Sequence, residues 1–155
     1  MEKNIVYHGS NVEVSVPRIL QNGFYKDFGY GFYCTGYEKQ AKRWAMTRKG
    51  DSVINHYEYK ADPKLKVLIF DEMTDEWLDF IISCRAGKPH DYDIVIGAMA
   101  NDQIYNFVSD YMDGAITREQ FWVLAKFKYP THQINFCTEK ALECLEYRGC
   151  EVIGL

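Results

Sequence analysis

The chain has 155 residues, 47% hydrophobic and 26% charged, a composition that predicts one globular domain over residues 1–155 and excludes extensive disorder. Its net charge of −4 argues against non-specific nucleic-acid binding, which depends on a basic surface. Five cysteines without a C-x-x-C pair indicate reduced thiols, and no apolar run is long enough for a signal peptide or a membrane span. We therefore expect a soluble, cytoplasmic protein that does not contact membranes.

In chain order, the apolar pattern predicts short strands and helices that are unevenly mixed, which is typical of an α+β fold. Strands are expected at residues 4–8, 32–34, 53–60, 66–70, 94–99 and 133–137. Helices are expected at residues 35–45, 74–85, 101–112, 117–126 and 138–147.

Polar residues stand at the expected starts of several helices. Thr35 with Glu38, and Thr117 with Gln120, have the spacing of a capping box. Asn101 can cap the helix that follows the strand at 94–99. These signals place the helix starts more firmly than the apolar pattern alone.

Residues 27–33, Asp-Phe-Gly-Tyr-Gly-Phe-Tyr, place two glycines one residue apart directly before an expected strand. Glycine allows positive φ angles and a close approach of the backbone to whatever lies over it. The dinucleotide-binding fingerprint and the phosphate loop are both excluded, because their glycines follow a strand and open a helix. Taken alone, the segment is explained by a tight turn before a core strand.

Together with Tyr7-His8-Gly9-Ser10, this segment resembles the ADP-ribosyltransferase superfamily, in its diphtheria-toxin-like and poly(ADP-ribose)-polymerase-like branch. That branch carries H-G-[ST] on its first strand, F-G-x-G-[IL]-Y on a later strand, and a third polar residue near the carboxyl end. Blocks at residues 27–35, 92–97, 100–102 and 133–138 also resemble an uncharacterised bacterial family within it. The resemblance covers nearly the whole chain and implies an ADP-ribosyltransferase-like split, twisted β-sheet core with flanking helices.

The resemblance implies that NAD+ is bound as a consumed co-substrate. His8 would hydrogen-bond the adenosine ribose, the backbone of Gly9 would meet the nicotinamide amide, and Ser10 would bond nearby. Tyr33 would stack on the nicotinamide ring, a flat cation that aromatic faces attract. The expected cofactor-binding residues are His8, Gly9, Ser10, Gly31, Phe32, Tyr33 and Trp44.

Two of these residues have structural alternatives. His8 can also be a buried histidine with an ordinary hydrogen-bond partner. Trp44 falls where related enzymes place a second aromatic, and core packing on its amphipathic helix explains it equally well. Ala41 stands where polymerase-like enzymes have a small hydroxyl residue, so one contact to the nicotinamide amide is missing.

The third catalytic position, after His8 and Tyr33, matches Gln133. A Glu there would favour the positive charge that develops on the ribose as the glycosidic bond breaks. Gln keeps a hydrogen bond and loses that charge, so cleavage would depend more on positioning and on the acceptor. The structural alternative is an exposed residue on an edge strand.

Asp27, Asn101 and Asp102 are expected on the acceptor side of the cleft, with a turn residue and a helix cap as their structural alternatives. No metal is implied, because the four histidines and five cysteines show no ligand spacing. The consecutive residues 56–58, His-Tyr-Glu, cannot converge on one ligand, because adjacent side chains of a strand face opposite ways.

These features favour an NAD+-dependent mono-ADP-ribosyltransferase whose acceptor is a protein, a nucleic acid or a small molecule. By analogy with bacterial relatives, it would be a toxin or defence effector neutralised by a small antitoxin-like protein. The alternatives are an NAD+ glycohydrolase, and a catalytically silent module that binds NAD+ or ADP-ribose or another protein.

Overall fold

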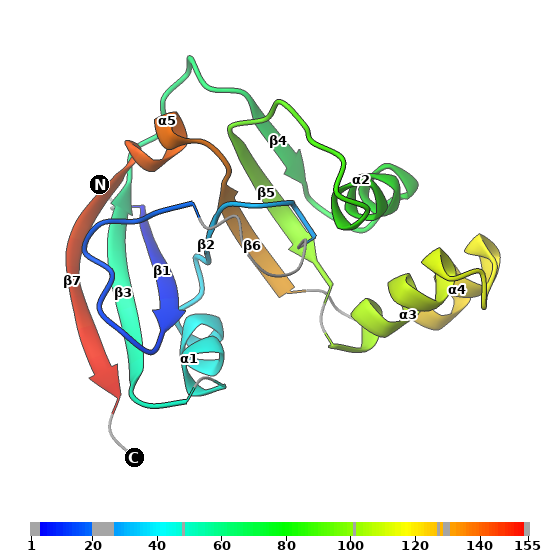
Figure 1. Ribbon diagram of the computed structural model, residues 1–155, viewed down its shortest axis with the longest axis horizontal. Helices are drawn as coiled ribbons and strands as arrows, with labels where there is room; N and C mark the ends of the chain where they lie inside the picture. Colours follow the sequence, from blue (N-terminus) through cyan, green and yellow to red (C-terminus); the bar gives the residue numbers. More distant parts are fainter. Residues whose placement is uncertain are drawn as a thin grey trace.

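A computed structural model describes residues 4–19, 27–47, 49–100, 102–126, 128 and 131–153. Within them the protein has two small β-sheets and five helices, so the predicted α+β class is confirmed (Figure 1). The two sheets share one hydrophobic core, and helices lie on the faces that are turned away from it (Figure 1).

The first sheet is antiparallel, with the strand order β1-β3-β7. Its strands are β1 (Ile5–Ser10), β3 (Ser52–Tyr59) and β7 (Leu145–Ile153). Helix α1 (Glu38–Met46) lies against β1 and β3 on one face of this sheet (Figure 1). The opposite face is turned towards the second sheet.

The second sheet has the order β2-β6-β5-β4, and only its β4–β5 pair is parallel among the described strands. Its strands are β2 (Phe32–Cys34), β6 (Thr131–Phe136), β5 (Ile94–Met99) and β4 (Val67–Phe70). The remaining helices are α2 (Asp75–Arg85), α3 (Asp102–Met112), α4 (Arg118–Ala125) and α5 (Glu139–Leu142). Helix α2 packs on this sheet through the buried residues Trp77, Leu78 and Ile81. Helices α3 and α4 pack together at the end of the molecule beyond α2 (Figure 1).

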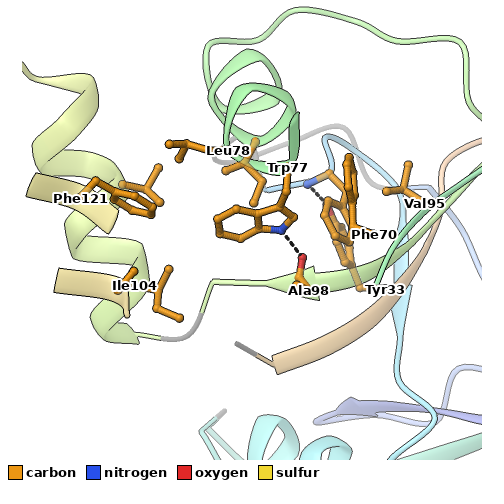
Figure 2. Close-up of a cluster of buried hydrophobic side chains, with 12 residues drawn as sticks. Tyr33, Phe70, Trp77, Leu78, Val95, Ala98, Ile104 and Phe121 are labelled. Atoms are coloured by element: carbon orange, nitrogen blue, oxygen red, sulfur yellow. Dashed lines mark hydrogen bonds between the residues drawn. The ribbon is translucent and has the colours of Figure 1, made fainter. Parts of the chain in front are cut away.

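Two hydrophobic cores hold these layers together. The larger core joins the second sheet to α2, α3 and α4, and Trp77 lies within it, donating a 2.6 Å hydrogen bond to the carbonyl of Ala98 (Figure 2). The smaller core fills the space between the two sheets, with Val6 and Tyr57 on one side and Phe136 on the other. The burial of apolar surface in both cores is the main stabilising term.

In the described part of the chain, a single backbone bridge joins β1 of the first sheet to β2 of the second. The backbone groups of Tyr7 and Thr35 exchange two hydrogen bonds, of 2.8 and 2.9 Å. Beyond this bridge, among the strands that the structure describes, β1 pairs only with β3 and β2 pairs only with β6. The ladder between β1 and β2 is therefore open from His8 onwards.

Most predicted elements are confirmed, with shifts of one to three residues at their ends. The strands at 32–34 and 94–99 match β2 and β5, and Thr74 and Thr117 cap α2 and α4 through their side chains. The capping box at Thr35 is wrong, because α1 begins after Tyr37 and no side chain caps it. Thr35 is held elsewhere, since its hydroxyl donates to the carbonyl of His132 at 3.1 Å.

The predicted helix at 138–147 is also wrong in its second half. Helix α5 ends at Leu142, and the chain then enters β7, a strand that the sequence analysis missed. Residues 145–148, Leu-Glu-Tyr-Arg, alternate apolar and polar, which is a strand pattern. Pairing with the whole length of β3 outweighs the short helical pattern before it.

Candidate functional site

His8 lies at the point where the two sheets separate. Its ring stacks on Phe32, with centroids 4.2 Å apart, on the face of β1 that is turned towards the second sheet. Its Nδ1 is 2.7 Å from the carbonyl oxygen of Tyr33. A carbonyl can only accept, so Nδ1 carries the proton in this contact. The imidazole thus occupies the opening between β1 and β2.

Gly9 is the contact point between β1 and α1. A Cβ atom at this position would lie 2.1 Å from the carbonyl oxygen of Ala41 and 2.9 Å from the amide nitrogen of Ala45. The helix therefore packs directly on the backbone of the strand, and only glycine fits. Ser10, the next residue, is buried, and Trp44 is half-buried on α1 between the two alanines.

Tyr33 lies in the larger core (Figure 2). It is on the opposite face of β2 from Phe32, on which His8 stacks. Its side chain is buried, and its hydroxyl donates to the carbonyl of Gly29 at 2.5 Å and accepts from the amide of Phe28 at 3.2 Å. Burial raises the pKa of Tyr33 well above its usual value, so the hydroxyl stays protonated. The tyrosine closes the glycine-containing loop onto the core.

Asn135 also fastens this loop, and the sequence analysis missed it. Its side-chain amide is fully buried and donates to the carbonyls of Phe28 at 3.2 Å and Tyr30 at 3.3 Å. Its Oδ1 lies only 2.0 Å from where a Cβ of Gly31 would stand, which explains the second glycine of the loop. The sequence does indicate it, because Asn135 is a polar residue between Ile134 and Phe136 in an apolar strand, and a buried polar residue usually has a hydrogen-bond partner.

Gln133 lies two residues before Asn135 on β6, on the same face of the sheet as Tyr33. It is buried, unlike the exposed edge-strand residue of the structural alternative, because β6 is flanked by β2 and β5. Its Nε2 is 3.4 Å from the hydroxyl of Thr131. The three predicted catalytic residues thus come from neighbouring strands, but the His8 ring lies on the opposite side of β2 from Tyr33 and Gln133.

Asp27 forms a buried ion pair with Arg85 of α2. The carboxylate accepts from Nε at 2.8 Å and lies 2.7 Å from Nη2, and both side chains are almost completely buried. It also accepts from the amide of Ala100 at 2.9 Å, directly after β5. The carboxylate therefore has structural partners, and it ties the loop to α2 and β5. Asn101 and the side chain of Asp102 lie outside the described residues.

A cavity of about 240 Å³ lies beside the loop, between it and the end of α2. It is lined by Gly29, Tyr30, Cys84, Gly87, Lys88, Pro89, His90, Tyr92, Cys137 and Thr138. His90 lines it while its Nε2 contacts the carbonyl of Phe28 at 3.1 Å. Burial raises the pKa of both Cys84 and Cys137 to about 12, so these thiols do not supply a nucleophile at neutral pH.

The five cysteines should therefore differ sharply in reactivity. Cys150 is exposed, whereas Cys34, Cys84 and Cys144 are buried and Cys137 is partly buried. We expect one thiol to react rapidly with Ellman's reagent in the native protein at pH 8, and all five after unfolding, since only about one in 10⁴ thiols with a pKa near 12 is ionised at that pH. In Cys150→Ser the rapid phase should disappear; a remaining rapid thiol would contradict this assignment of burial.

The fold and the site together define a small α+β protein in which a histidine lies at the opening between two sheets and a glycine loop is fastened beside it. The chain belongs to the family described as "Protein of unknown function (DUF3990)", which matches residues 4–147. No curated protein and no solved structure matches the chain. Within the described residues, no helix is both long and apolar enough to cross a membrane.

Proposed function

We propose that the protein is an NAD+-dependent mono-ADP-ribosyltransferase, with NAD+ bound where β1 and β2 separate. The observation that carries this proposal is the open ladder beyond the Tyr7–Thr35 bridge, with His8 at its entrance and Gly9 and Ser10 just beyond. Residues two apart on a strand direct their backbone groups to the same side. The backbone of Gly9 is therefore turned towards the opening, as a contact with the nicotinamide amide requires.

The proposed reaction breaks the bond between the nicotinamide nitrogen and the ribose, and the bonding electron pair leaves with nicotinamide. The acceptor nucleophile forms the new bond to the same carbon and loses its proton to solvent. Gln133 lies on the opposite side of β2 from the His8 ring, so the ribose would have to reach past β2 to contact it. There it would offer a hydrogen bond without a negative charge, and the developing positive charge would be stabilised less than by a carboxylate. Turnover should then be slow and depend on the acceptor. A role as a toxin or defence effector with a small protein inhibitor belongs to the same proposal.

A binding module without catalysis is the second candidate, and the placement of Tyr33 favours it. The ring is 7% exposed, and its hydroxyl is engaged by Gly29 and Phe28. Stacking on nicotinamide would require the ring to leave the larger core. A domain that binds NAD+ or ADP-ribose through the His8 side of the opening needs no such change.

Release of nicotinamide from NAD+ separates these candidates. For a transferase we expect slow release by the wild type, at least about tenfold faster release by Gln133→Glu, and about 100-fold slower release by His8→Ala, because a preorganised charge or donor has effects of this size. Chromatography of free nicotinamide measures the rate, with cell extract supplying acceptors. Label from ³²P-NAD+ retained on a macromolecule indicates transfer, and label found only in free ADP-ribose indicates hydrolysis.

Gln103→Glu is the matched control, because it makes the same chemical change at an exposed position of α3. Its release rate should equal that of the wild type. If NAD+ binds tightly but neither the wild type nor Gln133→Glu releases nicotinamide, catalysis is rejected and the binding module remains. If NAD+ does not bind, both candidates are wrong.

A further inference from the structure

Three potential metal ligands from distant parts of the sequence meet on the first sheet. Glu38 lies in the first turn of α1, His56 on β3 and Glu151 on β7. One ligand atom from each residue lies within 4.8 Å of those of the other two. No sequence motif joins these positions, because they are brought together only by the packing of α1 and the pairing of β3 with β7.

The strand register explains why these side chains share one face. His56 is opposite Gly149 and Ile54 is opposite Glu151, so the histidine and the glutamate are diagonal neighbours on the same side of the sheet. Tyr7 on β1 is opposite His56, and its ring meets the imidazole edge-on at 5.0 Å. This is the face covered by α1, whose first turn carries Glu38 over the strands.

The imidazole of His56 is incompletely satisfied. Its Nε2 is buried and has no hydrogen-bond partner in the described part of the chain. A buried polar atom without a partner is costly, and in native proteins it often marks a ligand or an ordered water. Glu38 and Glu151 likewise make no ion pair with any residue that the structure describes.

We propose that Glu38, His56 and Glu151 bind a divalent transition-metal ion, with Zn²⁺ as the representative. Imidazole nitrogen and carboxylate oxygen are both zinc ligands, whereas Ca²⁺ and Mg²⁺ prefer oxygen alone. Two ligand atoms about 2.1 Å from a tetrahedral ion lie about 3.4 Å apart, so small rotations of the two exposed glutamates close the site. Water would complete the coordination.

The charges support the same assignment. Two carboxylates and a neutral imidazole give a site of charge −2, which balances a divalent cation. The positive end of the α1 dipole would weaken the binding of a cation near the first turn, and the negative charge of Glu38 in that turn offsets this effect. Bound metal would connect α1 to β3 and β7, and would thereby stabilise the helix that packs on Gly9.

Metal binding to the full chain, stripped with EDTA, tests the proposal. Isothermal titration with Zn²⁺ should give one site, and saturating Zn²⁺ should raise the melting temperature by about 5 °C, because a ligand that binds only the folded state stabilises it. Glu151→Gln and His56→Gln should each weaken binding at least tenfold. Glu139→Gln removes a first-turn glutamate from α5 and should leave binding unchanged.

Adventitious binding by cysteine is distinguished with Co²⁺. The proposed site has no thiolate, so its visible spectrum should lack a sulfur-to-cobalt charge-transfer band. Cys150→Ser, at an exposed position whose side chain faces away from Glu151, should bind as tightly as the wild type. The proposal fails if the wild type binds no Zn²⁺, if Glu151→Gln binds normally, or if the spectrum shows thiolate ligation.

Discussion

Arg85→Met is expected to lower the free energy of unfolding by about 3–5 kcal/mol, the range found when one partner of a buried ion pair is removed. The carboxylate of Asp27 would stay buried and, among the described residues, would keep the amide of Ala100 as its one hydrogen-bond partner. Arg85 also stacks over the ring of Tyr105, with its guanidinium carbon 3.9 Å from the centroid, so that contact is lost too. Urea denaturation followed by circular dichroism measures the change.

Two further variants show whether burial of the charge causes the effect. Arg118→Met removes two ion pairs, with Asp75 and Asp79, at positions that are far more exposed, and should cost less than about 1 kcal/mol. The double variant Asp27→Asn with Arg85→Met should recover part of the loss, because no buried charge remains. Equal losses for Arg85→Met and Arg118→Met would contradict the explanation.

The Asp27–Arg85 pair matters for the candidate site because it connects the elements that hold the glycine loop in place. It joins the start of the glycine loop to the last turn of α2, and the bond to Ala100 adds the end of β5. Loss of the pair should therefore loosen the loop as well as destabilise the fold. Proteolysis of Arg85→Met near residues 27–31 under native conditions would show that loosening directly.

Gly9→Ala should destabilise the protein by about 3 kcal/mol or more, the upper range for overpacking. The new methyl group would stand 2.1 Å from the carbonyl oxygen of Ala41, which is backbone and cannot turn aside. Helix α1 would have to move away from β1, and the opening beside His8 would change shape. We therefore expect NAD+ binding, if present in the wild type, to weaken together with stability.

Gly36→Ala is the matched control, since a Cβ atom at that position meets nothing within 4 Å. Its unfolding free energy should stay within about 0.5 kcal/mol of the wild type. Both free energies come from urea denaturation. A loss below about 1 kcal/mol for Gly9→Ala would mean that α1 shifts easily and does not define the opening.

Local signals in the sequence were sufficient for most elements of the fold. The apolar run at 94–99 predicts the strand that is found there. Thr117 and Gln120 form the capping box that their spacing predicts. The glycine loop and His8 were also identified, and the structure brings them together through the 2.7 Å contact to the carbonyl of Tyr33. These features depend on residues that are close together in the chain, so short stretches of sequence are enough to predict them.

Side-chain direction at the site could not be obtained in the same way. Tyr33 was expected to face a ligand, and its hydroxyl instead closes the loop from within the larger core. Asn135 was missed because its partner Phe28 is 107 residues away in the chain. Alternation along a strand indicates that two faces exist, but both faces of the second sheet are buried, so only the packing shows which residues face the larger core and which face the first sheet.

The α+β class, the order of most elements and the residues around which a site can be sought all follow from local patterns of amino acids. Only the tertiary structure decided that Asp27 meets Arg85, that β7 replaces half of a helix, and that Glu38, His56 and Glu151 share one face. The physical reason is that helix caps and glycine turns follow from local hydrogen bonding and backbone freedom. Ion pairs, strand partners and ligand clusters follow from which distant surfaces pack together to bury the core.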